Sequence, residues 1–172
     1  IDEAFLDATG APSHARLGLP NVVVLRSLGK FYGLAGLRVG AVVTPAAWRE
    51  ALAAELGPWP VGGVALQLAA AALRDTAWQA AMRDQLQARS QALCAVLAGR
   101  GLASPQGTAL FRTVCTPRAA ALHAALAAQG VWTRLFDLPA PPDHPGPGFQ
   151  ALRLGLPPDD AALQRLDAAL AA

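Results

Sequence analysis

Residues 26–40 read Arg-Ser-Leu-Gly-Lys-Phe-Tyr-Gly-Leu-Ala-Gly-Leu-Arg-Val-Gly, and a short apolar run at residues 22–25 leads directly into them. The run is β-branched and uninterrupted, which predicts a buried strand. The stretch that follows carries a hydroxyl, an amine and a guanidinium, on Ser27, Lys30 and Arg38. Four glycines lie between and after them: Gly29, Gly33, Gly36 and Gly40. Because glycine permits positive φ and close approach of another group, the pattern predicts a binding loop.

The residue types in this loop suit a phosphate with an electrophilic carbon beside it. Arginine grips a phosphate with two hydrogen bonds, and lysine is the usual residue for Schiff-base chemistry. One alternative is a glycine-rich loop with solvated charges. Another is the Ser-x-x-Lys motif of penicillin-binding proteins and class A β-lactamases, in which Ser is the nucleophile. Those enzymes also need Ser-Asp-Asn and Lys-Thr-Gly. Neither occurs here, and Lys30 is the only lysine of the chain.

The spacing of Ser27, Lys30 and Arg38 resembles the cofactor-lysine segment of fold-type I pyridoxal-phosphate enzymes, the class I/II aminotransferase family. That resemblance implies that Lys30 carries the cofactor, pyridoxal 5'-phosphate, in a covalent bond. It also implies that Ser27 and Arg38 hold the cofactor phosphate.

The start of the chain is similar to the same family. It opens Ile-Asp-Glu-Ala-Phe, and the family carries Asp-x-Ala-Tyr or Asp-x-Ala-Phe before its lysine segment. The resemblance implies that Asp2 pairs with the pyridine nitrogen of the cofactor and keeps the ring an electron sink. Phe5 replaces the tyrosine of many members and cannot bond to the phenolic oxygen of the cofactor. Glu3 and Asp7 are interpreted as solvated loop charges.

Composition limits the classes of partner. The chain has 172 residues, 53% of them hydrophobic, and a net charge of +2. No basic stripe indicates nucleic-acid binding, and no uninterrupted apolar run is long enough to cross a bilayer. Cys94 and Cys115 have no metal-ligand spacing and are expected to be free thiols. We therefore expect a cytoplasmic protein without a metal, nucleic-acid or membrane partner.

The rest of the chain alternates helical and extended patterns, which predicts the α/β class. Arg74, Arg83, Arg89 and Arg100 are interpreted as a solvated helix face, and Trp78 as core. Residues 139–147, with His144, form a proline-rich loop. The other expected elements are a strand at 37–43, helices at 46–56 and 64–100 with a break or new cap at 75–76, a strand at 109–114, a helix from 116 to 129, strands at 131–135 and 149–156, and a final helix from 157.

The last expected strand carries a candidate substrate anchor. Arg153 is a single cation in the apolar run Leu-Arg-Leu-Gly-Leu-Pro, where burial is costly unless an anion pairs with it. In the family, an arginine of the similar C-terminal segment receives the substrate carboxylate. Arg134 is a second candidate from a neighbouring strand, and Arg112 is a third. A solvent-exposed strand position is the alternative for all three.

The resemblance to fold-type I enzymes also implies a domain organisation. Residues 1–73 would be the C-terminal part of the cofactor-binding large domain. Residues 74–172 would be the connecting helix and the small C-terminal domain. No initiator Met is present, and the family's upstream glycine-rich turn, stacking aromatic and Asn are missing, so we expect the C-terminal part of a longer enzyme. At full length that enzyme is expected to be a homodimer.

Within the family, the motifs resemble most the branch of threonine-phosphate decarboxylases of cobalamin biosynthesis. This implies decarboxylation of a phosphorylated amino acid, L-threonine O-3-phosphate, to aminopropanol phosphate. An aminotransferase of the histidinol-phosphate type is the first alternative. An inactive fragment or interaction module that lacks the N-terminal half of the site is the second.

Overall fold

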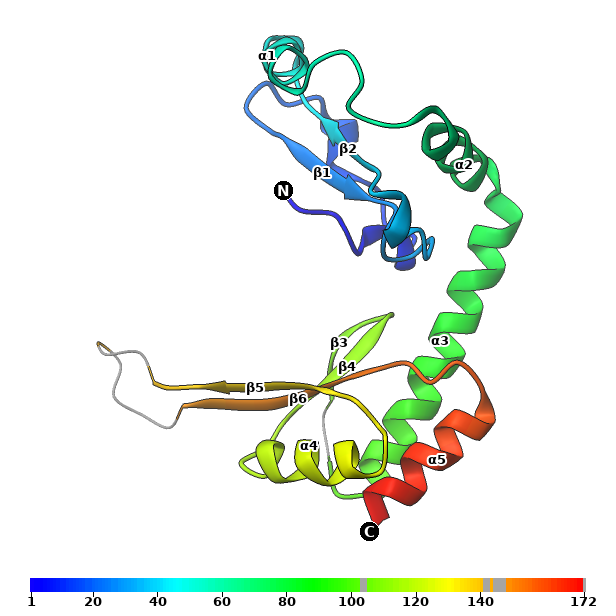
Figure 1. The fold of residues 1–172 in the computed structure, drawn as a ribbon, viewed down its shortest axis with the longest axis vertical. Helices are drawn as coiled ribbons and strands as arrows, with labels where there is room; N and C mark the ends of the chain where they lie inside the picture. The colour runs from blue at the N-terminus through cyan, green and yellow to red at the C-terminus, as the bar shows by residue number, and fades with distance from the viewer. Residues whose placement is uncertain (103–104, 141–142, 144–147, 172) are drawn as a thin grey trace. The chain divides into compact units, whose positions relative to one another are not determined.

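The computed structural model describes residues 1–102, 105–140, 143 and 148–171, and it divides into two compact units, Ile1–Arg83 and Asp84–Ala172. The mixed α/β class is confirmed (Figure 1). The helices and strands are, in chain order, β1 Val24–Ser27, β2 Gly40–Val43, α1 Ala46–Leu56, α2 Gly63–Arg74, α3 Thr76–Gly99, β3 Gln106–Thr108, β4 Phe111–Cys115, α4 Ala119–Ala128, β5 Arg134–Leu138, β6 Phe149–Gly155 and α5 Asp160–Ala171.

The first unit contains a small β ladder that positions the lysine loop. Strand β1 pairs antiparallel with β2, and Ser27 lies opposite Gly40. Residues 1–3 run parallel to β1: the Glu3 N–H donates to Leu25 O at 2.8 Å, and the Leu25 N–H donates to Ile1 O at 2.9 Å. The chain start and the lysine segment therefore share one ladder.

The strands of this ladder are shifted from their expected positions. Strand β1 runs from Val24 to Ser27 and not over residues 22–25, and β2 begins at Gly40 and not at residue 37. The reason for the late start of β2 is a 3-10 turn, Ala35–Leu37, after which Arg38 adopts a left-handed conformation. The chain can extend only after this turn.

The helices of the first unit follow the sequence pattern closely. Helix α1 spans Ala46–Leu56, as expected. The long helical region is broken at Asp75, whose Oδ1 accepts a hydrogen bond from the Trp78 N–H at 2.9 Å. An aspartate at this position satisfies an otherwise unpaired N–H of the first helical turn. The expected break is confirmed, and α3 then continues from the first unit into the second.

The second unit is an antiparallel sheet with helices packed against one face. Its strand order is β3-β4-β6-β5, and α4 lies along β5 and β6 (Figure 1). The core face of the sheet contains Val114, Leu152 and Leu154, which pack with apolar side chains of the helices. The helical members of that core include Leu93 and Leu97 of α3, Ala119 and Leu126 of α4, and Leu166 and Ala169 of α5.

Two strands of this sheet differ from expectation. The predicted bounds 131–135 were wrong. Strand β5 begins only at Arg134, because residues 131–133 close the end of α4. There the Val131 N–H donates to Leu126 O at 2.9 Å, and Thr133 is buried, its Oγ1 2.8 Å from His123 Nδ1. Strand β3 was not expected. It needs Gly107, at φ 147°, because a Cβ there would lie 2.3 Å from Phe111 O.

Some expectations fall where the structure gives no test. Most of the proline-rich loop at 139–147, including His144, lies outside the described residues. The domain boundary after residue 73 concerns the whole protein and stays a prediction. Among the described residues, no helix combines the length and apolar character needed to cross a membrane.

Candidate functional site

A cavity of about 210 Å³ lies where β1 ends and β2 begins. Ser27 and Arg38, the two residues expected to hold a phosphate, both line it. The Ser27 Oγ accepts a hydrogen bond from the Gly29 N–H at 3.2 Å, which folds the loop back on itself. The complete lining consists of Arg26, Ser27, Gly29, Leu34, Ala35, Arg38, Val39 and Gly40.

The glycines of this cavity are needed for its shape. A Cβ on Gly40 would lie 2.9 Å from Arg26 O, and a Cβ on Gly29 would lie 3.2 Å from the Ala35 Cα. Side chains at these two positions would therefore push the loop apart. The result is a small concave site with a hydroxyl and a guanidinium on its walls, and these groups fit a phosphate.

The backbone of Arg38 adopts an unfavourable conformation. Its backbone lies at φ 54° and ψ 40°, and it is the one non-glycine residue with positive φ in the described part of the chain. The left-handed conformation costs an L-residue about 1–2 kcal/mol, and glycine would avoid that cost. Strain of this kind concentrates at functional sites. The conformation therefore supports a requirement for the guanidinium of Arg38 itself.

Arg26 lines the same cavity, but carboxylates engage its guanidinium. Its Nη2 donates a hydrogen bond to Asp7 Oδ1, and its Nη1 lies 3.7 Å from Glu3 Oε2. The guanidinium of Arg38 makes one hydrogen bond among the described residues, from Nη1 to Ala35 O at 3.3 Å. Of the two arginines, Arg38 is therefore the one whose guanidinium has no carboxylate partner among the described residues.

Lys30 is exposed on the loop between two buried segments. Its Nζ lies 6.0 Å from the centre of the Phe5 ring, so the structure brings the chain start beside the only lysine. Phe31 and Tyr32, which follow Lys30, are both buried. Trp78 packs on both of their rings, with centroids 5.4 Å from Phe31 and 6.0 Å from Tyr32. This aromatic cluster fixes the backbone on the C-terminal side of Lys30.

Arg83 also packs against this aromatic cluster. Its Nε donates to Asp7 O at 2.8 Å, and its Cζ lies 5.3 Å from the centre of the Phe31 ring. The expectation that Arg83 belongs to a solvated face was therefore wrong. Trp78, expected to be core, does pack against buried rings.

Asp2 lies beside Leu25, two residues before Ser27, through a parallel bridge. Its Oδ1 accepts a hydrogen bond from the Ala4 N–H at 2.8 Å. Carboxyl ends of parallel neighbours meet at one edge of a sheet, where α/β proteins bind ligands. Asp2 and Ser27 therefore lie on neighbouring segments that run parallel, and the pairing of Asp2 with a cofactor nitrogen stays a prediction.

Glu3 and Asp7 are not solvated, so that expectation was wrong. Glu3 is only 4% exposed. Its carboxylate accepts hydrogen bonds from Ser13 Oγ at 2.6 Å and the His14 N–H at 2.8 Å, and its Oε1 lies 2.9 Å from His14 Nδ1. Burial alone would raise the pKa of Glu3, but these hydrogen bonds and the nearby Arg26 outweigh it and lower the pKa to about 2.

The Glu3 carboxylate makes the stability of this unit pH-dependent. Because its pKa falls from the usual 4.5 to about 2 on folding, its contribution is complete above pH 4.5 and is lost as the pH falls towards 2. The full effect is about 3 kcal/mol. We expect Glu3→Gln to lower the urea midpoint of the full-length protein at pH 7. We expect the difference in urea midpoint between this variant and wild type to shrink as the pH falls towards 2. Glu55→Gln, on the exposed side of α1, is the control, and equal midpoints at pH 7 would contradict the assignment.

The second unit presents two arginines side by side. In the register of the sheet, Arg153 of β6 lies opposite Arg134 of β5 and opposite Thr113 of β4. These three residues share one face, because directly paired residues point to the same side of a sheet. Leu152 and Leu154, on either side of Arg153, point to the helix-covered core. Arg153 and Arg134 are therefore brought together on the face opposite the core.

Like charges directly opposite each other destabilise a sheet unless an anion lies between them. Among the described residues, neither Arg134 nor Arg153 has a carboxylate within ion-pair distance. The Arg153 Cζ instead lies 4.8 Å from the ring centre of Phe111 and 5.9 Å from that of Phe136. This arrangement suits an anionic ligand.

Arg112 does not join this pair. It lies opposite Leu154 and therefore points to the core side of the sheet. There its Nε donates to the buried Ser90 Oγ at 2.7 Å. Its role is structural, and Arg112 is excluded as a ligand for an anion on the other face.

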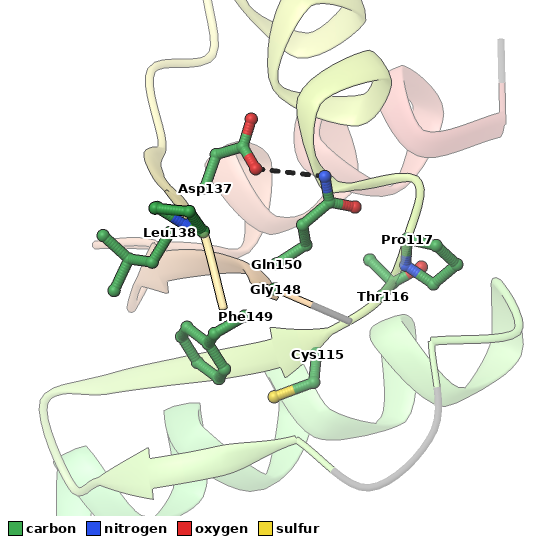
Figure 2. Close-up of a pocket in the computed structure, with 9 residues that line it drawn as sticks. Cys115, Thr116, Pro117, Asp137, Leu138, Gly148, Phe149 and Gln150 are labelled. Carbon is green, nitrogen blue, oxygen red and sulfur yellow. Dashed lines mark hydrogen bonds between the residues drawn. The ribbon is translucent and has the colours of Figure 1, made fainter. Parts of the chain in front are cut away.

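Other features of the second unit carry none of the expected site residues. A cavity of about 660 Å³ lies where β5 ends and β6 begins, beside the end of β4, and there Gln150 Nε2 donates to Asp137 Oδ1 at 3.0 Å (Figure 2). Among the described lining residues, Asp137 is the one that carries a charge, and Gln150 already engages it. In the described part of the chain, no three His, Cys, Asp or Glu side chains gather to form a metal site.

Sequence reasoning missed Glu3, Phe111 and Phe136. Glu3 gave no signal, because only the fold brings Ser13 and His14 to it. The two phenylalanines lie in strand-like runs, and their alternation indicates which residues of each strand share a face. The register between strands, which brings both rings to Arg153, is not readable from either run alone.

Comparison with known proteins agrees with the motifs. The sequence profile of the family described as aminotransferase class I and II matches residues 1–149. A threonine-phosphate decarboxylase of Pseudomonas aeruginosa is 46% identical over 171 residues, covering 99% of this chain and 49% of that protein. One of a Sinorhizobium species is 42% identical over 175 residues, with the same coverage.

A solved structure is similar as well. The histidinol-phosphate aminotransferase of Sinorhizobium meliloti, in complex with pyridoxal-5'-phosphate, matches with a TM-score of 0.77 and 24% identity. The match covers 98% of this chain and 46% of that one. The chain thus spans about half the length of the curated relatives it matches. Because the family profile covers residues 1–149 of the 172, the chain belongs to the class I and II aminotransferase family, whose members include enzymes that use pyridoxal phosphate.

Proposed function

We propose that the protein of which this chain forms about half is a pyridoxal-phosphate-dependent lyase. In this proposal it decarboxylates L-threonine O-3-phosphate to (R)-1-aminopropan-2-yl phosphate in cobalamin biosynthesis. The glycine-walled cavity that Ser27 and Arg38 share, on the loop of Lys30, is the observation that carries the proposal. The 46% identity to a threonine-phosphate decarboxylase supports the choice of reaction.

The residues of the first unit fit the cofactor. Ser27 and Arg38 would hold its phosphate, Lys30 would attach to its carbonyl carbon, and Asp2 would pair with its ring nitrogen. Phe5 beside Lys30 offers an apolar ring where a tyrosine would offer a hydroxyl. When bound, the cofactor supplies an electron-accepting ring that lets a bond at the substrate α-carbon break.

The residues of the second unit fit the substrate. Arg153 would hold the carboxylate, and Arg134, directly opposite it, is the alternative anchor. Holding this anion fixes the orientation of the bonds around the α-carbon, and orientation decides which of them breaks. Once the carboxylate has left, Lys30 is the residue that would return a proton to the α-carbon.

The proposal also covers the whole protein. Residues 1–73 would complete the cofactor-binding large domain, and residues 74–172 would form the connecting helix and the small C-terminal domain. We propose a cytoplasmic homodimer. Large apolar side chains stay uncovered in the first unit and support an extensive contact at full length, among them Trp48, Leu56, Trp59 and Val64.

Two substitutions at Arg38 separate cofactor binding from backbone strain. We expect Arg38→Ala and Arg38→Gly, in the full-length protein, to weaken cofactor binding about ten- to a hundredfold, because each loses a charge-assisted hydrogen bond of about 1.5–3 kcal/mol. The glycine variant, without cofactor, should be more stable than the alanine variant by about 1 kcal/mol, because only alanine keeps the left-handed strain. Absorbance titration and urea unfolding measure the two effects. An unchanged cofactor dissociation constant in both variants would remove Arg38 from the site.

Product analysis tests the proposed reaction. The full-length protein, loaded with pyridoxal phosphate, should release carbon dioxide from L-threonine O-3-phosphate in equal amount with aminopropanol phosphate. Amino transfer that depends on a keto acid, without carbon dioxide, would show the histidinol-phosphate type of chemistry instead. A protein that binds no cofactor would support the inactive alternative.

A further inference from the structure

Arg153 lies between two phenyl rings that come from different strands. Phe111 belongs to β4 and pairs with Gly155, two residues after Arg153. Phe136 belongs to β5 and pairs with Ala151, two residues before Arg153. The two rings therefore lie diagonally on opposite sides of Arg153, at 4.8 and 5.9 Å from its Cζ. Diagonal neighbours on one face are within reach of aromatic side chains.

We propose that Phe111 and Phe136 are positioning residues that hold the Arg153 guanidinium ready for the planar anionic group of the substrate. This inference rests on the proposed function, in which Arg153 is the substrate anchor. A cation near a ring face is attracted by the ring quadrupole. That attraction restricts a long side chain with many rotamers, and a preorganised group binds its ligand more tightly.

The rings leave the binding groups of Arg153 available. A guanidinium that stacks on an aromatic face keeps its N–H groups at its edge, where they can donate to both oxygens of a carboxylate. Among the described residues, no side chain accepts a hydrogen bond from the Arg153 guanidinium. The two rings thus orient the cation without using its donors.

The same geometry separates Arg153 from Arg134. Both arginines lie on one face, but of the two only Arg153 contacts aromatic rings among the described residues. Arg134 is exposed, whereas Arg153 is half-buried. We therefore assign the preorganised anchor to Arg153, and Arg134 adds positive charge beside it.

Substitutions at Phe136 in the full-length enzyme test the role of the rings. We expect Phe136→Leu, which keeps apolar bulk but loses the ring, to raise KM for L-threonine O-3-phosphate about three- to tenfold. Phe136→Tyr keeps the ring and should restore most of the affinity. The cofactor dissociation constant and the melting temperature should stay close to wild type. Leu138→Ala, at an exposed position of the same strand, is the control.

A double-mutant cycle decides whether Phe136 acts through Arg153. In the Arg153→Ala background, Phe136→Leu should have no further effect on KM, because the cation that the ring holds is gone. An equal loss in both backgrounds, or a loss that Phe136→Tyr shares, would overturn the inference and leave the proposed function standing. If Arg153→Ala itself left KM and kcat unchanged, the anchor of the proposed function would fail, and this inference with it.

Discussion

Arg153→Ala in the full-length protein is expected to lower kcat/KM for L-threonine O-3-phosphate about ten- to a hundredfold, while cofactor binding stays unchanged. Arg153 is half-buried on the open face of the sheet and has no carboxylate partner among the described residues. A hydrogen bond to a charged group contributes about 1.5–3 kcal/mol, which gives this range. Because the bound anion also fixes the orientation of the bond that breaks, kcat should fall together with substrate affinity.

Three further variants make this result specific. Arg153→Lys should recover only part of the loss, since an ammonium cannot reproduce the planar two-point grip of a guanidinium. Arg118→Ala removes an exposed arginine at the start of α4 and should behave as wild type. Wild-type kinetics in Arg153→Ala, with a loss in Arg134→Ala, would move the anchor to the opposite strand.

Lys30→Ala is expected to reduce turnover at least about a hundredfold, the lower end of what a positioned acid–base group contributes. Lys30 is the only lysine of the chain, and the loop that carries it is held by the buried Phe31 and Tyr32. The variant loses both the covalent attachment and the group that returns a proton to the α-carbon. Steady-state kinetics and the cofactor absorbance of the full-length protein measure the two losses.

Lys30→Arg is the matched control for this prediction. It keeps a positive charge near Phe5 but cannot form the covalent bond, since arginine stays protonated. We expect it to be as inactive as Lys30→Ala. Turnover close to wild type in either variant would show that another lysine of the full-length protein carries the cofactor.

Local patterns in the sequence were enough to predict the elements with strong signals. Helix α1 and the break at Asp75 were both predicted from the sequence, and both match the structure. The strand expected at 131–135 was displaced, because tertiary contacts of Val131 and Thr133 draw those residues to α4. Short strands depend on such contacts more than helices do, and β3 gave no signal of its own.

The residues of the candidate site also differ in whether the sequence predicted them. The resemblance of residues 26–40 to the lysine segment of the family identified Ser27 and Arg38, and the structure brings both to one cavity. The sequence did not predict that Glu3 is buried, because Ser13 and His14, which bind its carboxylate, come from a separate loop. Charges far apart in the sequence meet only through the fold, so a residue such as Glu3 looks solvated until the contacts are known.

Peptide mapping after borohydride reduction tests most directly the claim that residues 26–40 form the cofactor site. The full-length protein is loaded with pyridoxal phosphate, reduced, digested and analysed by mass spectrometry. We expect the added cofactor mass to lie on the peptide that contains Lys30, and we expect Lys30→Ala to carry no label. Label on any other lysine of the wild-type protein would contradict it.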